Sequence, residues 1–424
     1  MFKPELLSPA GSLKAMRMAF AYGADAVYAG QPRYSLRVRN NEFNLSTLET
    51  GINEAHKLGK KFYVVINIAP HNSKLTHFID DIKSVVSLQP DAFIVSDPGL
   101  IFLMQNHFPG VALHLSVQAN TTNWASVKFW QGQGIERVIL SRELSIEEIA
   151  EIRSHVPSMQ IEVFVHGALC MAYSGRCLLS GYINKRDPNQ GACTNACRWS
   201  YKVHDSKADD VGQYNPIEKP VLLSEKEKPD ELMTLDEDMH GSYILNSKDL
   251  RAVEHVGTLT DIGVHSLKIE GRTKSPYYVA RTAQVYRRAI DDAVSGKAFD
   301  TSLLTELNGM ASRGFTDGFL RRHVPQSLQN YDENHRVGQQ LLVGEFTGEP
   351  DDENYAELDV KNSFSIGDKL VLMTPDGNHD FTLTTLKDTE HQDIERAPGS
   401  GYQVKVKLPF KTSLRYAMLL KQVE

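Results

Sequence analysis

The chain has 424 residues, of which 41% are hydrophobic and 23% are charged, as in an ordinary globular protein. No apolar run approaches the roughly 20 residues that a membrane-spanning helix needs, so we expect a soluble protein. The net charge of −7 is uneven: residues from 335 onward carry 10 Lys and Arg against 15 Asp and Glu. The near-neutral remainder can still hold a basic surface, so RNA stays open as a substrate.

Eight short apolar segments, separated by helical patterns, predict eight β-strands. They span residues 5–11, 25–30, 61–67, 91–97, 112–120, 137–144, 161–167 and 266–272. This alternation predicts a parallel sheet covered by helices, and eight repeats favour closure into a (β/α)8 TIM-like barrel. An open, doubly wound sheet is the alternative. The barrel is favoured because a long helical segment, residues 275–296, follows the eighth strand.

Two segments depart from the barrel pattern. Residues 168–256 form an insertion between the seventh and eighth strands, and this insertion begins with a group of cysteines. From about residue 335, period-two alternation with turns at Gly or Asp predicts a small antiparallel β-barrel. We therefore expect a catalytic barrel domain over 1–334, which carries the insertion, and a β-barrel domain over 335–424. The N-terminus has no signal-peptide pattern, which predicts a cytoplasmic protein.

All four cysteines lie in the first part of the insertion, at Cys170, Cys177, Cys193 and Cys197. Four thiolates from one loop can hold either a tetrahedral zinc ion or an iron-sulfur cluster. The three residues between the last two cysteines suit a zinc loop, whereas the small residues around the ligands leave room for a cluster. The spacing leaves both metals open, and four buried structural thiols are the third interpretation.

The ends of the predicted strands carry polar and ionisable side chains, and the ends of parallel barrel strands form the active-site mouth. Arg142 and Arg272 are candidates to bind the carboxylates of a small acidic substrate, because guanidinium groups bind carboxylates bidentately. A buried ion pair, for example Arg142 with Glu270, is the alternative. His166 and Glu143 are candidates for proton transfer, with a hydrogen-bonded core histidine as the alternative for His166. The other strand-end residues are Ser8, Asn67, Asp97, Gln118 and Asn120.

The loop after the second predicted strand, QPRYSLRVRNNEF, contains three arginines and a tyrosine. Guanidinium groups and an aromatic ring suit phosphate contacts and base stacking, so this loop is a candidate RNA-binding element. Three basic residues of the cysteine segment, Lys185, Arg186 and Arg198, would extend it. An ordinary solvated loop is the alternative. The candidates for RNA contact are Arg33, Tyr34, Arg37, Arg39, Lys185 and Arg186.

The segment EVFVHGALCMAYSGRCLLS resembles the signature of the collagenase-like peptidase family U-32. The matching residues are Glu162, Phe164, Gly167, Cys170, Gly175, Cys177 and Ser180. Further stretches, such as SLKIEGRTKSPYYVARTAQVYRRAIDDA, extend the resemblance over nearly the whole chain. No HExxH or GxSxG motif occurs, so the residues give little support to the peptidase activity in the family's name.

What the resemblance implies is more specific than the residues alone. It implies a (β/α)8 barrel and a 4Fe-4S cluster held by the four cysteines. The members that the chain resembles most imply oxygen-independent hydroxylation of the wobble uridine of tRNA to 5-hydroxyuridine. The expected co-substrate and hydroxyl donor is prephenate, and the expected partner is the tRNA anticodon loop. The alternatives are an RNA-binding scaffold with a structural metal and a protease.

Overall fold

The structure is a computed structural model that describes residues 2–36, 41–169, 248–312, 314–321 and 339–423. It also describes the backbone of six short strands between residues 205 and 243, which pair antiparallel in twos. These strands are β8 (Asp205–Ala208), β9 (Tyr214–Ile217), β10 (Leu222–Glu225), β11 (Lys228–Thr234), β12 (Asp236–Asp238) and β13 (Gly241–Tyr243). In the described ranges, no helix is long and apolar enough to span a membrane.

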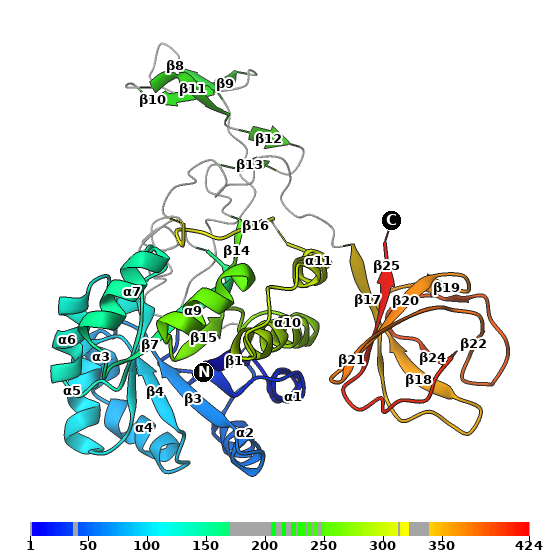
Figure 1. Ribbon diagram of the computed structural model, residues 1–424, viewed down its shortest axis with the longest axis horizontal. Coiled ribbons are helices and arrows are strands. Elements are labelled where there is room, and N and C mark those ends of the chain that lie inside the picture. Colours follow the sequence, from blue (N-terminus) through cyan, green and yellow to red (C-terminus); the bar gives the residue numbers. More distant parts are fainter. Residues whose placement is uncertain are drawn as a thin grey trace.

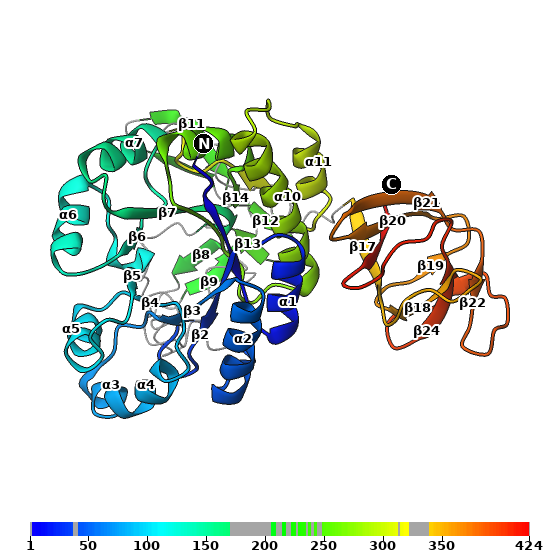
Figure 2. The same cartoon turned by 60° about the horizontal axis from the view of Figure 1, so that its bottom comes forward.

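Eight parallel strands form a closed barrel (Figure 2). Strand β15 pairs in parallel with both β7 and β1, so the sheet has no free edge at this point. This pairing confirms the predicted barrel and excludes the open sheet. The strands are β1 (Glu5–Pro9), β2 (Ala26–Gly30), β3 (Lys61–Ile66), β4 (Ala92–Val95), β5 (Leu113–Leu115), β6 (Arg137–Ile139), β7 (Gln160–Ala168) and β15 (Ser266–Ile269).

Helices surround the barrel (Figure 1). Ser, Asn or Asp side chains at Ser12, Asn44, Asp97, Asn123, Ser145 and Ser275 cap six of them by accepting a backbone N–H of the first turn. The long helix predicted over 275–296 is α10 (Pro276–Val294). The others are α1 (Leu13–Ala21), α2 (Leu45–Lys57), α3 (Asn72–Leu75), α4 (Phe78–Val86), α5 (Pro98–His107), α6 (Trp124–Gly132), α7 (Ile146–His155), α9 (Val256–Ile262) and α11 (Ser302–Asn308), with short 3-10 turns η1 (Val117–Ala119) and η4 (Val253–His255).

The chain returns to the barrel sheet before α9. Strand β14 (Asp249–Arg251) pairs antiparallel with the end of β7, where Asp249 lies opposite Ala168. It also pairs with the two-residue strand β16 (Phe315–Thr316). The two ends of the segment that carries the cysteines are therefore held side by side at the carboxyl end of β7.

Charged side chains buried inside the barrel pair with one another. Glu162 is fully buried, and its two carboxylate oxygens accept from Arg137 at 3.2 Å and from Lys268 at 2.8 Å. Arg137 also donates to Glu5 at 2.6 Å, near the amino ends of the strands. Burial alone would raise the pKa of Glu5, but Arg137, Tyr63 and Lys61 together outweigh burial and lower the pKa. These charges are paired because an unpaired buried charge is costly.

The C-terminal domain is a seven-stranded antiparallel sheet that curves into a half-barrel, with β21 and β22 at its two edges. Its own apolar core includes Val343, Leu358 and Leu419. The predicted antiparallel domain is thus confirmed. The seven strands are β17 (Gln340–Phe346), β18 (Tyr355–Val360), β20 (Lys369–Thr374), β21 (Gly377–Thr382), β22 (Leu386–Lys387), β24 (Gln403–Lys407) and β25 (Met418–Gln422), and β19 (Phe364–Ser365) pairs with β23 (Arg396–Ala397) in a separate two-stranded sheet.

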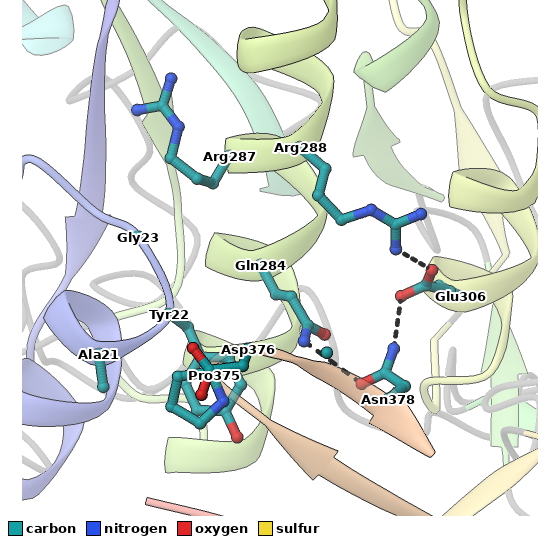
Figure 3. A pocket seen from close by; sticks show the side chains of 11 residues that line it. Ala21, Tyr22, Gly23, Gln284, Arg287, Arg288, Glu306, Pro375, Asp376 and Asn378 are labelled. Atoms are coloured by element: carbon teal, nitrogen blue, oxygen red, sulfur yellow. Dashed lines mark hydrogen bonds and ion pairs between the residues drawn. The ribbon is translucent and has the colours of Figure 1, made fainter. Parts of the chain in front are cut away.

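The two domains meet along α1, α10 and α11 (Figures 1 and 3). Glu306 of α11 accepts from Arg281 and Arg288 of α10 and from Asn378 of β21, so one carboxylate links both domains. A cavity of about 470 Å³ lies in this seam, with Gln284 on its wall. The arginines that line this cavity, Arg287 and Arg288, already pair with carboxylates. We therefore interpret the cavity as a packing gap between the two domains.

Candidate active site at the barrel mouth

The candidate site lies at the carboxyl ends of the barrel strands, and it includes the buried side chain of Arg272. Arg272 follows β15, is 9% exposed and donates to the Ser35 hydroxyl at 2.7 Å. Its guanidinium carbon lies 5.7 Å from the centroid of the Tyr28 ring. Gly30 makes room for this arrangement, since a Cβ there would lie 2.5 Å from the Ser35 hydroxyl oxygen and 2.8 Å from Arg272 Nη1.

Arg142 lies in the turn after β6 and is half-buried. Its guanidinium carbon is 3.9 Å from the centroid of the Phe164 ring, which is a close cation-π contact. Within the part of the chain that the structure describes, Arg142 has no hydrogen bond or ion pair, so the alternative pair with Glu270 does not form. Glu270 instead lies 3.1 Å from the Tyr28 hydroxyl. The neighbouring candidate Glu143 is also half-buried.

Lys268 is a functional candidate that the sequence reasoning missed. It is 3% exposed, and its Nζ lies 4.2 Å from the Tyr28 ring centroid and 5.5 Å from that of Phe164. Burial lowers the pKa of Lys268, although Glu162 opposes this shift. The alternation of side chains along the strand SLKIEGR could have identified Lys268, because residues 266, 268 and 270 lie on one face of the strand.

His166 does not face the barrel interior. Residues 162 and 164 of β7 point inward, but the register with β15 shifts between Phe164 and His166, as in a β-bulge. The bulge turns the imidazole away from the interior, against Tyr286 of α10, whose hydroxyl lies 3.3 Å from Nδ1. Burial lowers the pKa of His166 to about 3, so the ring is neutral at physiological pH. The strand-end position predicted for this side chain is therefore not a position at the mouth.

A small polar pocket of about 100 Å³ lies between the ends of β3, β4 and β5. Asn67 donates to Gln118 at 3.0 Å and accepts from the Leu36 backbone N–H, so it joins two strand ends to the loop after β2. Asp97, which also lines the pocket, caps α5 by accepting from the Leu100 N–H at 2.9 Å. The structure thus brings three predicted strand-end residues together and gives one of them a structural role.

The loop after β2 corrects one sequence prediction. Tyr34 is fully buried, packs edge-on against Phe78 and donates to Asp81 at 2.6 Å, so its ring is not available to stack on a base. Arg33 is exposed and forms an ion pair with the same carboxylate at 2.6 Å. Its neighbours Arg37 and Arg39 lie outside the described residues.

The four predicted metal ligands, Cys170, Cys177, Cys193 and Cys197, lie outside the described residues, as do Lys185 and Arg186. Among the residues that are described, no group of three His, Cys, Asp or Glu side chains could hold a metal ion. The four thiolates stay the predicted donor set, and they suit an iron-sulfur cluster or zinc. In the sequence, their segment lies between β7 and β14.

Comparison with known proteins covers both domains. Residues 11–330 match Peptidase family U32, and residues 339–421 match the Peptidase family U32 C-terminal domain. The chain belongs to peptidase family U32.

Several curated relatives of the chain are named for RNA hydroxylation, and others are named as a protease or a collagenase. It is 63% identical to tRNA hydroxylation protein P of Escherichia coli, over 99% of this chain and 97% of the relative. It is 59% identical to tRNA hydroxylation protein P of Haemophilus influenzae, over 100% of this chain and 97% of the relative. The 23S rRNA 5-hydroxycytidine C2501 synthase of Escherichia coli is 33% identical over 68% of this chain and 39% of its own length.

Proposed function

We propose that this U32 chain is a tRNA-modifying enzyme that hydroxylates the wobble uridine of tRNA to 5-hydroxyuridine in the cytoplasm. The observation that carries the proposal is the 63% identity, across both domains, to a protein named for tRNA hydroxylation. The target base, the co-substrate prephenate and the independence from molecular oxygen are inferred from the resemblance at the cysteine signature. Together they define a two-electron oxidation of the uridine C5–H bond to C5–OH, in which prephenate gives up one oxygen atom and is itself reduced by the two electrons.

The mouth offers the charges that this reaction needs. Arg142 and Arg272 are the proposed ligands of the prephenate carboxylates, and the absence of any acidic partner for Arg142 in the described ranges supports its role. Glu143 is the preferred candidate for proton transfer, because His166 is buried behind β7 and only weakly basic. Arg33, Arg37, Arg39, Lys185 and Arg186 are the proposed contacts to the anticodon loop, where cations neutralise phosphates.

We further propose that the four cysteines hold a 4Fe-4S cluster near the same mouth. Support comes from the pairing of β7 with β14, which holds both ends of the cysteine segment at the carboxyl end of the barrel. When bound, the cluster would supply either Lewis-acid activation of the hydroxyl donor or electron transfer.

Nucleoside mass spectrometry of bulk tRNA from a deletion strain tests this proposal. The wild-type gene should restore 5-hydroxyuridine derivatives, whereas the Cys177→Ala variant and a block in prephenate synthesis should each abolish them. An RNA-binding scaffold would leave the nucleoside profile independent of prephenate. A protease would instead hydrolyse peptides as a pure protein, even after removal of iron.

A further inference from the structure

Five side chains form a row of alternating cations and aromatic rings across the barrel mouth. In order they are Arg142, Phe164, Lys268, Tyr28 and Arg272, and every contact between neighbours lies between 3.9 and 5.7 Å. We call this row the cation-aromatic ladder. Cations within about 6 Å of a ring centroid are attracted by the negative face of the ring, so each step of the ladder is favourable.

The middle of the ladder is fixed by the barrel itself. Phe164 of β7 lies opposite Lys268 of β15 in the parallel register, and both side chains point inward. Phe164 is 7% exposed and belongs to the apolar cluster inside the barrel. Because the Phe164 ring is held in place, the Arg142 guanidinium that stacks on it has a defined orientation.

Arg142 differs from the other two cations of the ladder. Lys268 donates to Glu162 at 2.8 Å, and Arg272 donates to Ser35 at 2.7 Å. Arg142 has only the contact with Phe164 in the described part of the chain, so its guanidinium donors have no acceptor there. Two acidic residues lie beside the ladder, and both have other partners: Glu162 accepts from Lys268, and Glu270 accepts from Tyr28. Glu143, the next residue in the chain, forms no ion pair with Arg142.

We infer that Phe164 is a positioning residue that holds Arg142 ready to bind a carboxylate of the small acidic co-substrate. The inference rests on the proposed function, which makes that co-substrate prephenate. A free arginine side chain loses much rotamer freedom when it binds a ligand, and stacking removes part of that freedom beforehand. A guanidinium whose plane is fixed can present two parallel N–H groups to one carboxylate, which is the strongest geometry for this pair.

Calorimetric binding of prephenate to the intact, cluster-loaded protein tests the inference. Phe164→Leu removes the ring face, and we expect prephenate affinity to fall about tenfold, in line with a partly buried cation-π contact. The affinity for tRNA should change less than about twofold, and Phe164→Tyr should retain prephenate binding. In an Arg142→Gln background the Phe164→Leu change should have no further effect, because Phe164 acts through Arg142.

Arg142→Lys is a second variant that leaves the core intact. It keeps the charge but loses the planar fork, so we expect a loss of prephenate affinity similar to that of Phe164→Leu. Unchanged prephenate affinity in both Phe164→Leu and Arg142→Lys would overturn the inference while leaving the proposed function in place. An equal Phe164→Leu effect with and without Arg142 would also overturn it, as would a loss confined to tRNA binding. Wild-type protein that binds no prephenate would reject both the co-substrate and the inference.

Discussion

Replacing Gly30 by alanine should test whether Arg272 binds the substrate carboxylate. The new Cβ would lie 2.5 Å from the Ser35 hydroxyl oxygen and 2.8 Å from Arg272 Nη1, two atoms that hydrogen-bond to each other at 2.7 Å. To reach a contact of 3.4 Å, these atoms must retreat by about 0.9 and 0.6 Å. Both are side-chain atoms that can move by rotation about side-chain bonds, whereas the Ser35 Cβ, 3.0 Å from the new Cβ, can move only with the backbone.

The retreat should disturb Arg272, because it disrupts the hydrogen bond that fixes the guanidinium. A hydrogen bond to a charged group contributes about 1.5–3 kcal/mol, which corresponds to roughly a 10- to 100-fold loss of prephenate affinity if that geometry is needed. The free energy of unfolding should also fall, by about 1–3 kcal/mol, because the folded protein loses the same hydrogen bond and alanine offsets only part of that loss by restricting the unfolded chain. Calorimetric titration with prephenate and urea denaturation measure the two quantities.

Gly257→Ala is the matched control. This glycine lies in the first turn of α9, and a Cβ there would have no heavy atom within 4 Å. It should leave prephenate affinity unchanged and stabilise the protein by up to about 1 kcal/mol, since alanine is the better helix former. If Gly30→Ala binds prephenate as tightly as the wild type, the role of Arg272 as a carboxylate ligand is wrong.

Three further predictions concern the surroundings of the mouth. Glu162→Gln should lower the free energy of unfolding by about 3–5 kcal/mol, because it removes the carboxylate that pairs with the buried Arg137 and Lys268. The control Glu54→Gln, in the partly exposed pair with Arg17, should cost about 1 kcal/mol or less. Equal losses of the two variants in urea denaturation would contradict this prediction. The unfolded chain protonates His166 below pH 6.5, but the folded protein does so only near pH 3. The free energy of unfolding should therefore fall by about 1.4 kcal/mol for each unit by which the pH is lowered from 6.5 to 3, and unfolding curves of His166→Gln should lack this slope. An unchanged slope in the variant would assign the effect to other groups. Tyr34→Phe should leave tRNA affinity unchanged in filter binding and should cost about 1 kcal/mol of stability, because the hydrogen bond to Asp81 is lost. Weaker tRNA binding by this variant would show that the Tyr34 side chain does take part in RNA binding.

The barrel was predictable because its strands are short, apolar and separated by helical segments with clear ends. The closing contact between β15 and β1 follows from the number of repeats. The orientation of His166 was not predictable, because a bulge after Phe164 interrupts strict alternation and leaves no mark in the residue types. Tyr34 likewise reads as a polar loop residue, and only the packing of Phe78 beneath it reveals its burial.

The arginines of the mouth divide in the same way. Arg142 and Arg272 were found from strand ends alone, since the carboxyl ends of parallel strands converge. Their different environments, a ring face for Arg142 and a hydroxyl for Arg272, depend on neighbours distant in the sequence. Lys268 was overlooked because a lysine inside a strand is usually exposed at its edge, and here Glu162, more than a hundred residues away, allows its burial.

The most direct test of the central claim is an anaerobic reaction of the purified, cluster-loaded protein with unmodified tRNA and prephenate, followed by nucleoside mass spectrometry. We expect the wobble uridine to gain one oxygen atom as 5-hydroxyuridine, only when both tRNA and prephenate are present and not with the Cys177→Ala variant. Hydroxylation that proceeds without prephenate, or no hydroxylation by protein that carries an intact cluster, would contradict the account.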